Sequence, residues 1–182
     1  LFGDYNPSGK LPISFPRNVG QIPIFYNHYN TGRPVTKSGD IRYKSAYIDV
    51  PNDPQYAFGH GLSYTTFSYS NLKLSSTAIN QKERVKVSFT LTNTGKVEGE
   101  EVAHLYIQDT FASVVRPVKE LKDFAKVKLK PGESKEISFE LSPEKLAFYQ
   151  EEKGWITEPG EFKVMVGTAS NDIKLKSSFE LK

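Results

Sequence analysis

The sequence predicts an all-β fold, an immunoglobulin-like antiparallel β-sandwich of about seven strands that follows an extended, turn-rich segment. Two observations lead to this prediction. From Thr66 onward, short runs alternate apolar with polar residues, which is the period of a strand with one buried face. Residues 1–65 instead hold 7 of the 11 prolines, 7 of the 13 glycines and 11 of the 23 aromatic residues. We therefore divide the chain into an N-terminal segment, residues 1–65, and a sandwich, residues 66–182.

Alternating runs mark the expected strands. In the run at residues 85–91, Val85, Val87 and Phe89 fall on one face, while the lysine and serine between them fall on the other. The turn sequences at residues 93–95 and 130–133 separate consecutive runs. The expected strands lie around residues 72–74, 85–91, 102–108, 124–129, 137–141, 162–166 and 173–181.

One short helical connector is expected between two of these strands. Ser142 can cap a helical turn that Pro143 opens, and the turn then carries Leu146, Phe148 and Tyr149 inward. Strands joined by turns, with almost no helix, are typical of an antiparallel sandwich whose sheets each have one wet face.

The N-terminal segment cannot be regular helix or sheet throughout. Proline removes a backbone donor and glycine weakens the interior of an element, so extended chain with many turns is expected. The segment is nevertheless too aromatic for a solvated linker. We expect it to press against a folded surface, for which a further domain of a longer protein is one candidate. The aromatic residues behind this expectation are Phe25, Tyr26, Tyr29, Tyr43, Tyr47, Tyr56, Phe58 and Tyr64.

Composition excludes several classes of function. The 24 basic and 21 acidic side chains are interspersed, and a net charge of +3 provides no basic patch for nucleic acid. Without cysteine, the chain has no disulfide, thiolate nucleophile or thiolate metal ligand. No run approaches the roughly 18 apolar residues of a membrane span, so no membrane partner is expected. The chain starts at Leu1 without methionine or a signal pattern, from which we expect the interior of a longer polypeptide.

Carboxyl pairs are the first candidates for hydrolytic chemistry, because retaining glycosidases need two such groups about 5–5.5 Å apart. Neighbours along a strand point to opposite faces, so Glu100 and Glu101 cannot converge. The other pairs fall in predicted turns. For all three pairs, solvated charge in a loop or at a sheet edge is the ordinary role and the one predicted here. We therefore assign no catalytic residue. These other pairs are Glu151 with Glu152 and Glu158 with Glu161.

The three histidines, His28, His60 and His104, lack partners at the spacing of a zinc site or of a serine or cysteine triad, so no metal site is assigned. His104 lies in an expected strand and is predicted to be a surface or half-buried cross-strand residue. The two glycines at 59–61 flank His60, indicate an unusual backbone turn and do not open a helix. Residues 130–134 likewise lack the glycines and helix of a phosphate loop, so no nucleotide or other cofactor is expected.

Trp155, the only tryptophan, has two interpretations. Its indole face could stack on the C–H groups of a pyranose ring, but single tryptophans in sandwiches more often pack in the core or at an edge. Substrate-binding residues therefore stay unassigned, and a sugar-binding sandwich remains an alternative function.

Three stretches, taken in their order and spacing, are similar to one known family. The first begins LFGDYNPSGKLP and runs to TGRP at residues 31–34, and the second surrounds FGHGLSY at residues 58–64. The third couples RPVKEL at 116–121 with KPGE at 130–133 and EPGEF at 158–162. They resemble the glycoside hydrolase family 3 β-glucosidases of the periplasmic bacterial type. Two positions depart from the pattern, since tyrosine is more usual at His60 and glycine at Asp123.

The resemblance implies that the chain is a C-terminal fragment. Residues 1–65 would be the end of an α/β sandwich domain together with an interdomain strap, and residues 66–182 a fibronectin type III-like domain. In the complete enzyme, an aspartate nucleophile from an N-terminal barrel and a glutamate acid/base from the α/β sandwich would give a retaining, exo-acting mechanism. No residue here matches either motif, so both catalytic carboxylates are expected upstream of Leu1.

The function implied by the resemblance is that of a non-catalytic structural module of a β-glucosidase, which releases terminal β-D-glucose from oligosaccharides or glucosides. The expected partners are the catalytic domains of the parent chain, through which alone it meets a β-glucoside, in a periplasmic or secreted location. A carbohydrate-binding sandwich without hydrolytic role is the alternative, and an adhesion module fits the aromatic N-terminal segment poorly. The polar loop at residues 110–116 is expected to reach toward the aglycone end of the parent active site.

Overall fold

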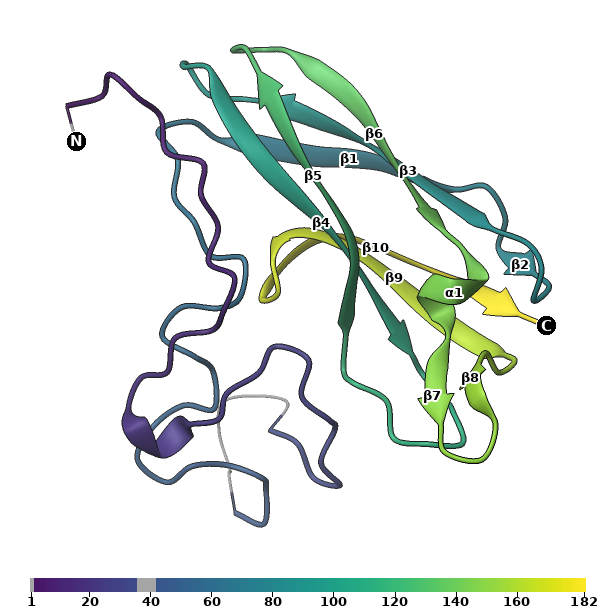
Figure 1. Cartoon of the computed structure of the whole chain (residues 1–182). Helices are drawn as coiled ribbons and strands as arrows, with labels where there is room; N and C mark the ends of the chain where they lie inside the picture. Colours follow the sequence, from purple (N-terminus) through teal and green to yellow (C-terminus); the bar gives the residue numbers. More distant parts are fainter. Residues whose placement is uncertain (1, 36–41) are drawn as a thin grey trace.

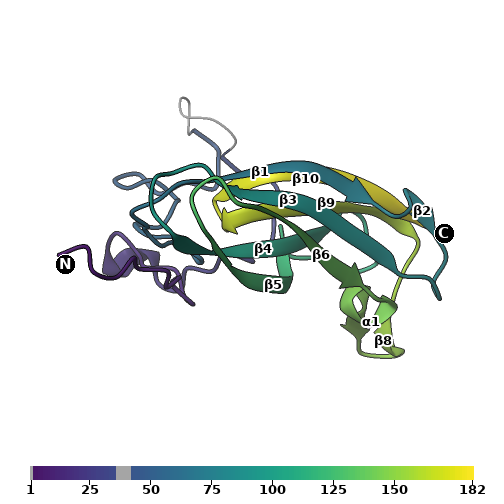
Figure 2. The ribbon, with the colours of Figure 1, turned by 90° about the horizontal axis from the view of Figure 1, so that it is seen from above.

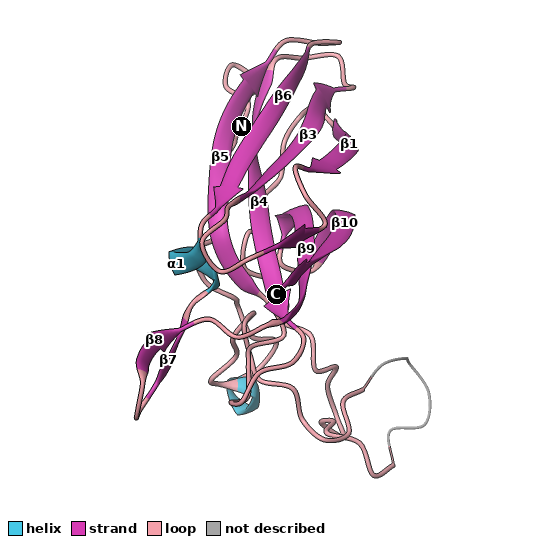
Figure 3. Cartoon of the chain, turned by 90° about the vertical axis from the view of Figure 1, so that its right-hand side faces the viewer, coloured by secondary structure: helices cyan, strands magenta, loops and turns pink. Residues whose placement is uncertain are grey.

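Two stacked β-sheets form the larger part of the molecule (Figure 1). The strands are β1 (Phe67–Leu74), β2 (Ala78–Ile79), β3 (Val85–Asn93), β4 (Gly99–Asp109), β5 (Glu120–Leu129), β6 (Ser134–Leu141), β7 (Phe148–Gln150), β8 (Gly154–Ile156), β9 (Gly160–Ala169) and β10 (Asp172–Leu181). One sheet has the order β1-β3-β6, and the other has the order β2-β10-β9-β4-β5. The third pair, β7-β8, is a small hairpin that projects beside them (Figure 3).

The structure is a computed structural model that describes residues 2–35 and 42–182. Leu1, where the first family-like stretch begins, therefore lies outside the described residues. Within them, no helix combines the length and the apolar character needed to cross a membrane.

The two sheets pack through the alternating faces that the sequence predicts. Figure 2 shows the strands of the sandwich from above. On β3, the residues Val85, Val87, Phe89 and Leu91 are each at most 1% exposed. Burial of each such side chain contributes about 1.5–3 kcal/mol. The predicted all-β sandwich is thus confirmed. The opposing sheet contributes Ala103, Leu105, Ile107, Val127, Leu129, Phe162, Val164, Val166, Phe179 and Leu181 to the same core.

Three short strands escape the sequence prediction, because β2, β7 and β8 have only two or three residues each and cannot show an alternation. The predicted helical turn is present as α1 (Pro143–Leu146), although the Ser142 side chain makes no capping hydrogen bond. Leu146 and Phe148 are buried as expected. Tyr149 is not, since the residue after Phe148 on β7 points to the opposite face and is 61% exposed.

Strand β5 also departs from the expected pattern. Its inward positions are Ala125, Val127 and Leu129, so Phe124 points outward and is 62% exposed. The pairing of β4 with β5 shifts register between Leu105 and Tyr106.

The N-terminal segment folds back on itself with little regular structure. Its described residues contain one short 3-10 helix, Val19–Gln21, and no β-strand. Two legs run side by side: the amide of Leu11 donates to the carbonyl of His60 at 2.9 Å, and the amide of Phe15 donates to the carbonyl of Tyr56 at 2.8 Å. Gln21 is 1% exposed and donates from Nε2 to the Pro51 carbonyl at 2.8 Å, which fixes the turn between the legs.

The aromatic residues of this segment divide into two groups. Tyr26 and Phe58 are partly buried and pack against the outer face of the five-stranded sheet, so the sandwich itself supplies part of the expected surface. The other six are 41 to 84% exposed: Phe25, Tyr29, Tyr43, Tyr47, Tyr56 and Tyr64. For these six residues, the expected packing surface remains a prediction.

Candidate functional site

The N-terminal segment meets the sandwich along strand β4, and this contact, which we call the seam, contains several of the candidate residues. The seam joins residues 6–10, 26–28 and 57–65 to β4 and to the neighbouring residues 117–121 and 169–170. In Figure 1 the segment runs along one side of the sandwich, to the left of β4 and β5.

Glu101 is the buried charge of the seam. It is 5% exposed, so the prediction of a solvated edge charge is wrong for this residue. Its Oε1 lies 3.2 Å from Nζ of Lys10 on the N-terminal segment and accepts a hydrogen bond of 3.1 Å from the Tyr69 hydroxyl on β1. Burial raises the pKa of Glu101, and the nearby Lys10 acts against that rise. One carboxylate thus connects the segment and both sheets.

Glu100 points to the other face of β4, as strand geometry requires. Its carboxylate accepts a hydrogen bond of 3.0 Å from Ser8 Oγ and lies 2.8 Å from Nζ of Lys126. Beside it, Asn6 donates from Nδ2 to the Glu98 carbonyl at 2.9 Å. The two neighbouring glutamates therefore hold the segment from opposite faces of one strand and do not converge on a common point.

His104 lies beneath the segment in a stack of rings. The rings of Tyr26 and Phe58 stack with centroids 4.3 Å apart, and Phe58 lies 5.9 Å from the His104 ring. The Nδ1 atom of His104 is 3.1 Å from the hydroxyl of Tyr106. His104 is only 5% exposed, so the expectation of a surface or half-buried residue is wrong. Burial, with a smaller effect of Lys10, lowers the pKa of His104 to about 4, which keeps the imidazole neutral at pH 7.

Gly59 permits this close approach. Its backbone has φ +86°, which favours glycine, in agreement with the unusual turn expected here. A Cβ added at Gly59 would lie 2.7 Å from Cε1 of His104 and 2.9 Å from Cα of Ala169. No larger residue fits at this position without displacing the segment from the sheet.

Backbone hydrogen bonds extend the seam beyond the ring stack. The amide of Ser170 donates to the Phe58 carbonyl at 2.9 Å, and the amide of Val118 donates to the His28 carbonyl at 3.0 Å. The amide of Leu121 donates to the hydroxyl of Tyr26 at 3.2 Å. The segment is therefore fixed at several separate points of the sandwich.

The remaining histidines have local contacts. His28 is exposed, with Nδ1 3.0 Å from the Tyr29 carbonyl, and the His60 ring lies 4.8 Å from the ring of Tyr56. Across residues 2–35 and 42–182, no group of three or more His, Asp or Glu side chains is arranged to hold a metal ion.

The other carboxyl pairs lie at the far end of the sandwich. Glu158 accepts two hydrogen bonds of 2.7 Å, one from the amide and one from the hydroxyl of Ser113. Glu161 belongs to β9 and not to the predicted turn. Glu151 and Glu152 are exposed in the turn between β7 and β8. Of these four carboxylates, Glu158 has an evident role, since it fixes the loop at residues 110–116.

Arg116 holds the end of the same loop. Its guanidinium donates to Oε2 of Glu120 at 2.7 Å, lies 3.5 Å from Oδ2 of Asp109 and sits 4.6 Å above the ring of Phe148. Burial raises the pKa of Asp109, which Arg116 opposes. The loop that these residues fix exposes Phe111, which is 85% accessible.

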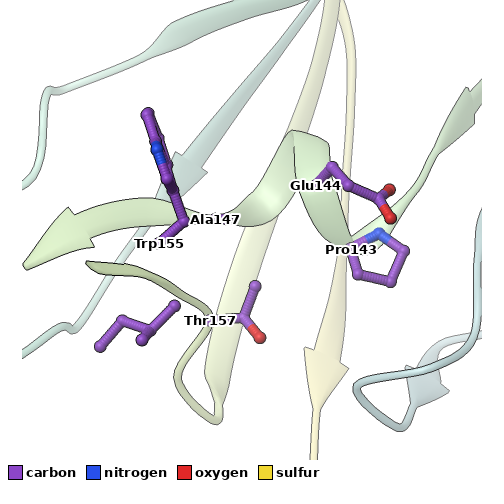
Figure 4. Close-up of a pocket in the computed structure, with 6 residues that line it drawn as sticks. Pro143, Glu144, Ala147, Trp155 and Thr157 are labelled. Atoms are coloured by element: carbon purple, nitrogen blue, oxygen red, sulfur yellow. The ribbon is translucent and has the colours of Figure 1, made fainter. Parts of the chain in front are cut away.

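A pocket of about 490 Å³ opens between α1 and β8 (Figure 4). Trp155 forms one wall; its side chain is 72% exposed and its ring lies 5.9 Å from that of Tyr149, edge to face. The tryptophan is thus an edge residue and is not part of the core. The other lining residues are Pro143, Glu144, Ala147, Ile156 and Thr157.

Two family models match the chain. Residues 1–64 match the glycosyl hydrolase family 3 C-terminal domain, and residues 101–170 match the fibronectin type III-like domain.

Curated relatives extend over the whole chain. It is 52% identical over 181 residues to the periplasmic beta-glucosidase of Salmonella typhimurium and 44% identical over 182 residues to a putative beta-xylosidase of Formosa agariphila. These alignments include 100% of this chain but only 24% and 23% of the two relatives. The chain therefore spans about a quarter of the length of the relatives it matches.

Solved structures agree in fold and sequence. A mutant beta-glucosidase from Listeria innocua in complex with laminaribiose superposes with a TM-score of 0.91 at 46% identity, covering 99% of this chain and 25% of that one. A beta-glucosidase from Erythrobacter marinus superposes with a TM-score of 0.89 at 40% identity, covering 100% of this chain and 22% of that one.

Substitution of Gly59 by alanine should loosen the seam. The added methyl group strains the positive φ and collides with His104, so we expect the free energy of unfolding to fall by about 2–3 kcal/mol in urea denaturation. Gly132→Ala is the matched control, because its φ of +76° carries the same backbone strain with nothing within 4 Å of the new Cβ. Equal losses in the two variants would contradict the close packing of Gly59 on His104.

The free energy of unfolding of the chain should fall as the pH is lowered, because His104 takes up a proton more readily in the unfolded state. Its pKa in the folded protein, about 4, lies below the unfolded value of about 6.5, so its contribution is complete above pH 6.5 and is lost between pH 6.5 and 4. The expected slope is up to about 1.4 kcal/mol per pH unit. His104→Gln should remove that part of the slope, while the carboxylates, including Glu101 opposite Lys10, still titrate. Identical slopes for the variant and the parent in urea denaturation across this range would disprove the assignment.

Proposed function

Since this chain belongs to glycosyl hydrolase family 3, as its resemblance to that family predicted, we propose that it is the non-catalytic structural module of a retaining, exo-acting β-glucosidase. The complete enzyme would release terminal β-D-glucose from oligosaccharides or glucosides. The relatives are about four times as long as the chain, and the two carboxylates of the reaction would lie in the length that it does not span.

The single observation that carries the structural role is the seam. The N-terminal segment matches the C-terminal domain model of the family, and it is held on the sandwich by a buried ion pair, a ring stack and backbone hydrogen bonds. A joint with so many fixed points restricts motion between what lies on its two sides. In the parent enzyme, the sandwich would brace the domain from which the segment emerges, and residues 1–65 would act as the strap between them.

The six exposed aromatic residues of the segment are the reason for proposing a further contact between the strap and another surface. Among them, Phe25 is 61% exposed and Tyr29 is 62% exposed. Large aromatic side chains are stabilised by burial. We assign their partner surface to the catalytic domains of the parent chain.

The names of the relatives inform the substrate and the location. The Salmonella typhimurium relative is a periplasmic beta-glucosidase, whereas the Formosa agariphila relative is a putative beta-xylosidase. The higher identity to the former favours glucosides as substrates and a periplasmic or secreted location.

The 182-residue chain alone should not hydrolyse an aryl β-glucoside. The reason is that the two carboxylates of the reaction are expected in the part of the relatives that this chain does not span. Among the carboxyl pairs singled out in the sequence, Glu100 and Glu101 point to opposite faces of β4, and Glu158 is bonded to Ser113. The measurement is release of the aryl alcohol by highly purified chain, with the full-length enzyme as positive control. Turnover that persists after removal of contaminating glucosidases would refute the non-catalytic role.

Lys10→Met should weaken the bracing. It leaves Glu101 buried without its cation, so we expect the unfolding free energy of the chain to fall by about 3 kcal/mol. In the full-length enzyme, the variant should shorten the half-life of activity on heating and leave kcat near its original value at low temperature. Lys126→Met is the control, since its pair with Glu100 is solvent-exposed and should contribute less than about 1 kcal/mol. Equal effects of the two substitutions would count against a structural role for the seam.

The loop at residues 110–116 is proposed to reach the aglycone end of the parent active site. It is held rigidly by Arg116 and Glu158, and it exposes Phe111 and Val115 where a leaving group could contact them. Shortening the loop in the full-length enzyme should therefore change the ratio of kcat/KM between glucosides with small and large leaving groups. Unchanged ratios across a series of leaving groups would exclude this role.

A further inference from the structure

The pocket at Trp155 lies apart from the seam. In Figures 1 and 2, the hairpin β7-β8 and α1 project from a different part of the sandwich from the N-terminal segment. The pocket is open to solvent, and its volume of about 490 Å³ falls in the range of small-molecule sites. The contacts that hold the N-terminal segment therefore do not involve this pocket, which is free for another role.

Two kinds of surface meet in the pocket. Figure 4 shows Trp155 on the side of β8, Glu144 and Pro143 on the side of α1, and Thr157 between them. Trp155 offers an apolar aromatic face, and Tyr149 supports it from the neighbouring strand. The Glu144 carboxylate and the Thr157 hydroxyl line the same pocket and can accept hydrogen bonds.

This combination matches the chemistry of a pyranose ring. A pyranose has an apolar face of C–H groups, which packs on an aromatic face, and a rim of hydroxyl groups, which donate hydrogen bonds. An ionised carboxylate is an acceptor only and binds hydroxyl donors strongly. A hydrogen bond from Ser142 lowers the pKa of Glu144, so the group is charged at neutral pH.

The charge of Glu144 restricts the class of saccharide that the pocket can bind. Glu144 is a charged group inside the pocket, and the neighbouring cations Arg84 and Lys145 are already paired with Glu140 and Asp123. Acidic sugars would therefore meet repulsion, whereas a neutral saccharide would not. An acidic peptide is disfavoured for the same reason.

We propose that the pocket between α1 and β8 is a binding site for neutral saccharides, in which a pyranose stacks on Trp155 and donates hydrogen bonds to Glu144. The inference rests on the proposed function only for the identity of the sugar, a β-linked gluco-oligosaccharide. Affinity should be weak, in the millimolar range, since one ring and a few hydrogen bonds carry it.

The experiment uses the 182-residue chain, because Trp155 is its only tryptophan and its fluorescence reports directly on the pocket. Titration with laminaribiose and with longer β-1,3-gluco-oligosaccharides should give a saturable change in emission. A polyuronate oligosaccharide of the same length should give a weaker change or none. Absence of any change up to tens of millimolar of each neutral saccharide would overturn the proposal.

Variants separate the site from general surface effects. In calorimetric titration, Trp155→Ala should weaken binding by about tenfold or more, and Glu144→Gln should weaken it less. Phe124→Ala, which removes another exposed aromatic residue, should leave affinity unchanged. Because Trp155 is exposed, thermal unfolding should show that the alanine variant keeps its fold. Equal affinities of Trp155→Ala and the parent chain would also overturn the proposal.

Two further measurements distinguish saccharide binding from self-association and from a failure of the proposed function. If the tryptophan emission depends on protein concentration and not on saccharide, a second copy of the chain occupies the pocket, and the proposal fails. Hydrolysis of an aryl β-glucoside by the full-length enzyme tests the proposed function separately. An active enzyme whose C-terminal chain binds no saccharide would refute this inference and leave the proposed function standing.

Discussion

Burial of strand β4 on both faces is the constraint on which the rest of the structure depends. Its inner face carries Leu105 and Ile107 into the core between the sheets, and its outer face carries His104 and Tyr106 under the N-terminal segment. A strand in an antiparallel sandwich ordinarily has one wet face. Here the segment replaces that water, so the sandwich and the segment form one packed unit over β4.

Two kinds of interaction stabilise the seam, apolar packing and a buried ion pair. On the outer face of β4, the ring stack at Phe58 and the close approach of Gly59 exclude water. On the other face, the carboxylate of Glu101 is only 5% exposed and is paired with Lys10. Removing one partner of such a pair is far more costly than removing a pair at the surface. This arrangement suits a joint that must keep its geometry, and it contrasts with the pocket at Trp155, whose walls are exposed and ready for a ligand.

Periodicity predicted the sandwich because burial on one face is a local property of each strand. The residues on β3 show it clearly, since every second side chain enters the core. The same logic failed for His104 and Glu101, whose burial depends on residues about 40 to 100 positions away in the sequence. The alternating pattern of a strand does not indicate which distant residues cover its polar face. For Trp155 the two interpretations differed only in exposure, which depends on the tertiary position of a three-residue strand.

The seam also has a consequence for the order of events during synthesis. Phe58 accepts a hydrogen bond from Ser170, and Tyr26 accepts one from Leu121, so residues that leave the ribosome early have partners that leave it much later. Until β4 and β9 are made and paired, the segment has no face on which to dock, and its aromatic side chains stay open to other chains. Closing contacts of such long sequence separation is slow. The N-terminal segment therefore needs protection from contacts with other chains until β9 has left the ribosome.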